Sequence, residues 1–130
     1  MKVEGIGKAY AKKLAKAGIE TTGQLLKQGS SPKGRKEIAK NTEISPKLVL
    51  EWVNHVDLFR IKGVGEEYAD LLEAAGVDTV VELAQRKPVN LHQKMTEVNA
   101  KKKLVRQLPS EAQVEGWISQ AKELPRVVTY

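Results

Sequence analysis

The chain of 130 residues has no cysteine and two histidines, His55 and His92. Without cysteine it has neither a disulfide nor a thiolate metal site. The histidines are far apart in the sequence and lack the cysteine or carboxylate spacing of a zinc site, so we expect no metal and no cofactor. The start of the chain lacks the apolar run of a signal peptide or membrane span, which favours a cytoplasmic location.

The sequence also lacks a catalytic pattern. None of the serines lies in a nucleophile-elbow context, and no carboxylate pair has an evidently buried setting. The two Gly-x-Gly pairs are not dinucleotide fingerprints, because no predicted strand precedes either pair and the third glycine is missing. We therefore expect a protein that is not an enzyme and has no small-molecule substrate.

The formal net charge is +6, with 22 Lys and Arg against 16 Asp and Glu. Residues 1–58 contain 11 basic and 6 acidic side chains, whereas residues 59–130 contain 11 and 10. The length is that of a single domain. The first part of the chain is therefore basic and the second is near neutral.

One stretch of the sequence occurs twice. The segment 3–28 aligns without gaps to a second segment 58 positions further along, with nine identical residues. Average residue usage gives about two identities by chance in such a window. The identities include both glycines of Gly5-Ile6-Gly7 and of Gly63-Val64-Gly65, which we call the first and second glycine turns. We predict one domain of two repeats, residues 1–58 and 59–130.

Each glycine turn precedes apolar residues at helical spacing, and Gly18 or Gly76 then ends the predicted helix. Glycine adopts backbone conformations that other residues avoid, and we expect unusual φ and ψ angles at Gly7 and Gly65. At a helix N-terminus after such a turn, free N–H groups and the positive end of the dipole face outward. A phosphate can bind there.

The pattern apolar-x-Gly-apolar-Gly, followed by a helix with a small residue at its fourth position (Ala11 and Ala69), resembles the helix-hairpin-helix motif. The continuations at 17–26 and 75–84 are similar to helix-hairpin-helix modules of DNA repair and recombination proteins. Over its whole length the chain resembles an uncharacterised bacterial family of tandem helix-hairpin-helix proteins, a domain of unknown function. The resemblance implies a fold rather than a role.

Helical periodicity and capping residues continue to the end of the chain, so we predict a compact all-α fold of about eight helices. The expected helices are 8–17, a short one after Thr21 or Thr22, 32–41, 46–58, 66–75, a short one after Thr79, 91–102 and 111–124. We expect a pseudo-twofold axis between the repeats, with the last helix packed on the first glycine turn. The expected core contains Leu14, Leu25, Leu48, Trp52, Leu72, Leu83, Val114 and Trp117.

The first glycine turn is the predicted nucleic-acid-binding site. Its residues are Gly5, Ile6, Gly7, Lys8, Lys12, Lys13 and Lys16. The backbone N–H groups would meet a phosphate, and the lysines would add attraction that does not depend on base sequence. The alternative is a turn that only packs helices, beside an ordinary solvated lysine face.

The second glycine turn, Gly63, Val64 and Gly65, is predicted to be structural. Glu66 and Glu67 follow it at once and would repel a phosphate. Seven extra residues in the second repeat belong to a basic connector that includes Lys101, Lys102, Lys103 and Arg106. This connector is either a second phosphate contact or a flexible solvated segment.

Two functions of different class fit these features. The first is binding of a DNA or other nucleic-acid backbone without sequence preference, through the first glycine turn. The alternative is a helical protein–protein interaction or scaffold module with no nucleic-acid role. The charge asymmetry fits both, so the expected partner is DNA or another protein, and not a membrane.

Overall fold

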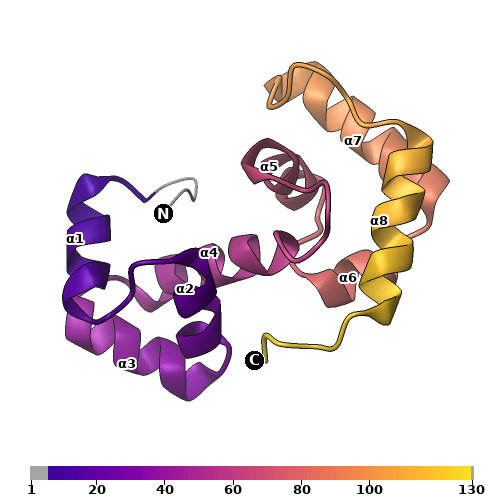
Figure 1. Ribbon diagram of the computed structural model, residues 1–130. Coiled ribbons are helices and arrows are strands. Elements are labelled where there is room, and N and C mark those ends of the chain that lie inside the picture. The colour runs from indigo at the N-terminus through magenta and orange to yellow at the C-terminus, as the bar shows by residue number, and fades with distance from the viewer. Residues whose placement is uncertain (1–5, 130) are drawn as a thin grey trace. The chain divides into compact units, whose positions relative to one another are not determined.

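The computed structural model describes residues 6–129, and among these it contains eight α-helices and no strand (Figure 1). The helices are α1 (Lys8–Lys16), α2 (Thr22–Gly29), α3 (Pro32–Thr42), α4 (Pro46–Leu58), α5 (Glu66–Ala74), α6 (Val80–Ala84), α7 (Pro88–Lys102) and α8 (Glu111–Glu123). The predicted all-α fold is confirmed.

Polar side chains begin four of the helices. At α2, the Thr21 hydroxyl accepts a hydrogen bond from the Gln24 N–H (3.1 Å), and the Gln24 side chain accepts one from the Thr21 N–H (3.1 Å). This reciprocal pair is a capping box, and the same box begins α8. Single hydroxyl caps from Ser31 and Thr79 begin α3 and α6. The caps explain why these helices start where the sequence predicts.

Glycines in the left-handed region follow α1 and α5. Gly18 has φ +84° and Gly76 has φ +94°. Beyond each glycine the chain folds back, because the Ile19 N–H donates to the Leu14 carbonyl (2.9 Å) and Val77 makes the equivalent bond at 2.8 Å. Both apolar residues are fully buried, so each glycine brings a core residue onto the last turn of its helix.

The chain forms two compact units. Unit 1 consists of the described residues of Met1–Asp57 and Val127–Tyr130, and unit 2 of Leu58–Arg126. The cut after Asp57 falls one residue before the predicted boundary between the repeats. The last residues were assigned to the second repeat by the sequence pattern, but those that are described belong to unit 1.

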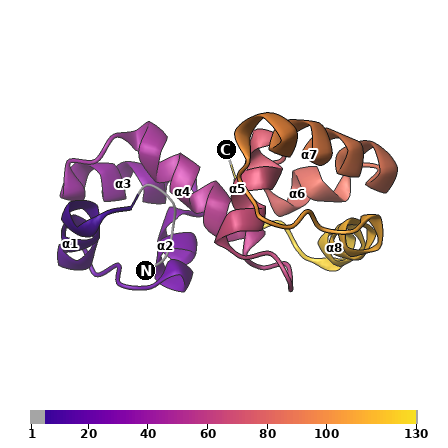
Figure 2. The same cartoon turned by 90° about the horizontal axis from the view of Figure 1, so that it is seen from above.

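In unit 1, α1 and α2 pack against α3 (Figure 2). The apolar side chains buried here include Leu14, Ile19, Leu25, Ile38, Val49, Trp52 and Val53. The Trp52 ring lies edge-on to the Tyr10 ring, with 5.2 Å between the ring centroids. The helix that follows the first glycine turn is thus joined to α4 by an aromatic contact.

The C-terminal segment joins unit 1 through backbone hydrogen bonds. The Thr129 N–H donates to the Ser30 carbonyl at 2.7 Å. The buried Arg35 guanidinium donates to the carbonyls of Gly29 (2.9 Å), Ser30 (3.1 Å) and Thr129 (2.6 Å). Arg35 therefore ties the end of α2 to Thr129, which lies 94 positions after Arg35 in the chain.

In unit 2, α8 lies along α6 and α7, and α5 packs on α7. Seventeen residues form one buried apolar cluster, among them Ile61, Val64, Leu72, Val77, Leu83, Met95, Val114 and Trp117. Tyr68 contacts the Trp117 ring with 5.2 Å between centroids, the distance that separates the matching pair in unit 1. We predicted a contact between the last helix and the first glycine turn; that turn includes Gly5, which lies outside the described residues, and the contact stays a prediction.

The predicted core is largely correct. Of its eight residues, seven are buried and Leu48 is half-buried. The predicted helix boundaries hold to within one residue at α1, α3, α4, α5 and α8. α7 begins at Pro88, three residues before the predicted start, because proline is accommodated at the first helical position. Within the described chain, no helix combines the length and the apolar character needed to cross a bilayer.

Candidate nucleic-acid interface

The first glycine turn leads directly into α1. Gly5 lies outside the described residues, Ile6 is half-buried and Gly7 is exposed. Gly7 is the N-cap of α1, and its carbonyl accepts the Ala11 N–H at 2.9 Å. Within residues 6–129 no side chain caps α1. Among the described residues, no side chain therefore competes with an anion for the N–H groups of its first turn.

The charges on α1 are all positive. Lys8, Lys12, Lys13 and Lys16 are exposed, and the helix contains no acidic residue. Lys13 and Lys16 lie in its last turn, where a cation interacts favourably with the helix dipole. Lys8 lies at the opposite end, where the dipole is also positive. The Lys8 charge and the positive end of the dipole repel each other, and such an interaction at a helix terminus is about 0.3–1 kcal/mol. A bound anion would relieve this repulsion.

The second glycine turn is closed by its own hydrogen bonds. The Ile61 N–H donates to the Leu58 carbonyl, and the Val64 N–H donates to the Ile61 carbonyl, each at 3.1 Å. Gly63 has φ +94°, a left-handed conformation that strongly favours glycine. Val64 is buried in the core of unit 2. The turn is therefore a rigid part of that core.

Helix α8 covers the second glycine turn. The Gln120 side chain accepts a hydrogen bond from the Lys62 N–H (2.9 Å) and donates one to the Lys62 carbonyl (3.3 Å). Trp117 is so close that its ring nitrogen would lie 3.1 Å from a Cβ atom on Gly63. Gln120 was not identified from the sequence, although its position one turn after Trp117 places it on the same side of α8.

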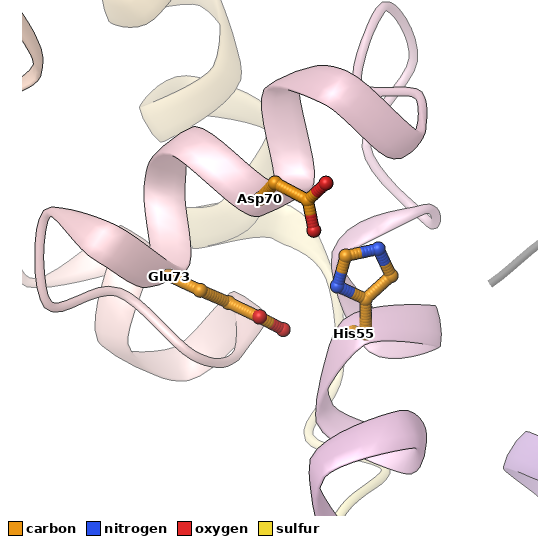
Figure 3. Close-up of side chains that lie close together, drawn as sticks. All are labelled: His55, Asp70 and Glu73. Carbon is orange, nitrogen blue, oxygen red and sulfur yellow. The ribbon is translucent and has the colours of Figure 1, made fainter. Parts of the chain in front are cut away.

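The helix after the second glycine turn is acidic. Glu66 and Glu67 occupy the first turn of α5, where a carboxylate interacts favourably with the dipole. Asp70 and Glu73 project from α5 one turn apart, and Figure 3 shows them with His55, which belongs to α4. The positive end of the α5 dipole is thus already balanced by two carboxylates.

The expected unusual backbone at Gly7 and Gly65 is wrong. Gly7 has φ −86° and ψ −177°, and Gly65 has φ −99° and ψ −166°. Both are extended conformations that any residue adopts, and a Cβ atom at either position would meet nothing within 4 Å. The conformational requirement for glycine in the second turn lies at Gly63 instead.

The geometry defines an all-helical protein with two glycine turns, one leading into a basic helix and one into an acidic helix. The chain belongs to the family described as Domain of unknown function (DUF4332), whose model matches residues 4–124. Neither a curated protein nor a solved structure matches the chain.

Proposed function

We propose that the chain is a non-catalytic helix-hairpin-helix module that binds the phosphate backbone of nucleic acid through its first glycine turn. The supporting observation is that the uncapped first turn of α1 is followed by four exposed lysines and no carboxylate. Backbone amides and lysine side chains recognise phosphate oxygens without contact to base edges. Binding is therefore expected to show no sequence preference.

The two turns should contribute unequally to this binding. The first presents free amides, exposed cations and a repulsive charge at Lys8 that a phosphate would neutralise. At the second, the Lys62 N–H already donates to Gln120, and two glutamates occupy the first turn of the following helix. These contacts best support phosphate binding through one glycine turn, which we propose for a cytoplasmic protein.

Salt-dependent binding to a generic DNA duplex tests the proposal. Fluorescence anisotropy should give an affinity that falls steeply between about 50 and 200 mM salt, because each phosphate contact releases counterions. The variant Lys8→Glu with Lys12→Glu should bind more weakly and with a flatter salt slope. Lys27→Glu with Lys47→Glu changes the net charge equally at exposed lysines outside α1, and should bind more tightly than the first variant.

Two results would contradict the proposal. If the two double variants lose affinity equally, only net charge matters and the first glycine turn has no special role. If the parent protein shows no salt-dependent affinity for the duplex, the alternative of a helical protein–protein interaction module takes its place.

A further inference from the structure

The connector, residues Lys101–Pro109, comprises the last two residues of α7 and the chain that leads to α8, and side-chain hydrogen bonds fix it to unit 2. The Asn99 amide oxygen accepts the Val105 N–H at 3.0 Å, and the Asn99 amide nitrogen donates to the Val105 carbonyl at 3.3 Å. Val105 itself is only 7% exposed. The Asn99 side chain therefore binds both backbone polar groups of a buried residue. These bonds favour an anchored segment over the flexible solvated segment that the sequence also allowed.

Two further bonds hold the second half of the connector. The Tyr68 hydroxyl donates to the Gln107 carbonyl at 3.2 Å. The His92 ring nitrogen Nε2 lies 2.9 Å from the Pro109 carbonyl oxygen. Leu104 and Leu108 pack against the apolar cluster of unit 2. The backbone of the connector is thus anchored from its middle to its end.

The basic side chains of the connector are all on the outside. Lys101, Lys102, Lys103 and Arg106 are exposed, and no acidic residue occurs between Glu97 and Glu111. Lys101 and Lys102 end α7, where cations also stabilise the helix dipole. That explanation does not extend to Arg106, which lies beyond the helix on the fixed segment.

The connector also lies beside the start of α5. Tyr68, which holds Gln107, is the third residue of that helix and follows directly after Glu66 and Glu67. In unit 1 the helix after the glycine turn provides its own cations. In unit 2 that helix is acidic, and the neighbouring cations come from a connector that is seven residues longer than its counterpart.

We propose that this connector is a second phosphate-binding surface for nucleic acid, in which Lys101, Lys102 and Arg106 contact the backbone. The inference rests on the proposed function, because it adds a contact to the same activity. A fixed row of exposed cations with no acidic residue among them in the sequence attracts the phosphate backbone and releases counterions when it binds. Because the backbone is anchored, its cations lose less freedom on binding than those of a flexible loop.

The test uses the full chain and a generic DNA duplex over a series of salt concentrations. The connector variant is Lys101→Gln, Lys102→Gln and Arg106→Gln, and Lys103 is left unchanged because it adopts φ +49° at the end of α7. The control variant is Lys47→Gln, Lys87→Gln and Lys122→Gln, which removes the same charge at exposed lysines elsewhere. Far-ultraviolet circular dichroism establishes that each variant is folded.

The connector variant should bind about tenfold or more weakly near 100 mM salt. Its salt slope should flatten by about 2–3, because each phosphate that the protein neutralises contributes about 0.9 to the slope. Asn99→Ala should also weaken binding while keeping every charge. A connector variant that binds like the parent, or no more weakly than the control variant, would overturn the inference.

The variant Lys8→Glu with Lys12→Glu, measured in the same series, separates the two proposals. If that variant loses affinity and the connector variant does not, the connector surface fails and the first glycine turn stands. If only the connector variant loses affinity, the first glycine turn fails and the connector surface stands. A parent protein without affinity for the duplex overturns both.

Discussion

Helices α1 and α5 occupy the same place in the two repeats, and they share one fully buried leucine but carry opposite charges. Leu14 of α1 and Leu72 of α5 are both fully buried, 58 positions apart. At the same spacing, Lys8 is replaced by Glu66 and Lys12 by Asp70. The inward positions keep the packing of each unit, whereas the outward positions determine what the helix can bind.

The two glycine turns also differ in the residues that surround them. The second turn is in contact with Trp117 and is hydrogen-bonded to Gln120 of α8. Within residues 6–129 no side chain caps either α1 or α5, but the first turn of α1 has no carboxylate, whereas that of α5 has two. The comparison indicates that repetition of a sequence preserves a fold more strictly than it preserves a binding site.

The largest expected effect tests what the repeats share. Trp52→Ala and Trp117→Ala should each lower the free energy of unfolding by about 3–5 kcal/mol, because each indole is buried against a tyrosine ring. Urea denaturation followed by circular dichroism measures both losses. A loss below about 1 kcal/mol for one tryptophan would mean that the two aromatic pairs are not equivalent.

Substitution of Arg35 tests the contact between α3 and the C-terminal segment in unit 1. Arg35→Leu removes bonds to three carbonyl groups and should lower the free energy of unfolding by about 2–3 kcal/mol. Gln93, an exposed residue of α7 in unit 2, serves as a control. Gln93→Leu should change the same free energy by less than about 0.5 kcal/mol. Equal effects in urea denaturation would show that Arg35 has no special role in fixing the C-terminal segment.

The two glycines of the second turn should respond differently to alanine. Gly63→Ala should cost about 1–3 kcal/mol, because φ is +94° and the new Cβ atom would lie 3.1 Å from the Trp117 ring nitrogen. Gly65→Ala should cost less, about 0.5–1 kcal/mol, since the backbone is extended and the site is open, and only the preference for glycine over alanine at an N-cap is lost. Thermal unfolding measures both. The reverse order would contradict the conformations described for this turn.

The smallest expected effect compares Gly7→Val with Gly65→Val. Both variants should remain close to the parent in stability, because both positions are extended and uncrowded. The valine at position 7 would cover the amides of the first turn, and DNA affinity should fall about fivefold, which corresponds to one hydrogen bond of about 1 kcal/mol. The valine at position 65 should leave the affinity unchanged. Equal loss of affinity would remove the distinction between the turns.

Local patterns were sufficient to predict most of the fold. Apolar spacing and hydroxyl caps determine where a helix begins and which face it buries, and α4 spans the predicted residues. The predicted helix 91–102 left Pro88 outside it, although proline also fits the first position of a helix. The sequence alone does not distinguish these two uses.

The long-range contacts could not be predicted from the sequence. Gln120 reaches Lys62 across 58 positions, and Thr129 reaches Ser30 across 99. No local periodicity encodes either contact, since each depends on how separate helices pack. The charge contrast between the glycine turns was visible in the sequence, but the cover that α8 places over the second turn was not.

Amide chemical shifts measured by NMR during titration with a short DNA duplex test most directly whether the first glycine turn binds phosphate. We predict that the amide signals of Ile6, Gly7 and Lys8 shift as the duplex is added, because these N–H groups meet a phosphate. The signals of Val64 and Gly65 should remain in place. Shifts of equal size at both turns, or shifts at the second turn alone, would contradict this prediction.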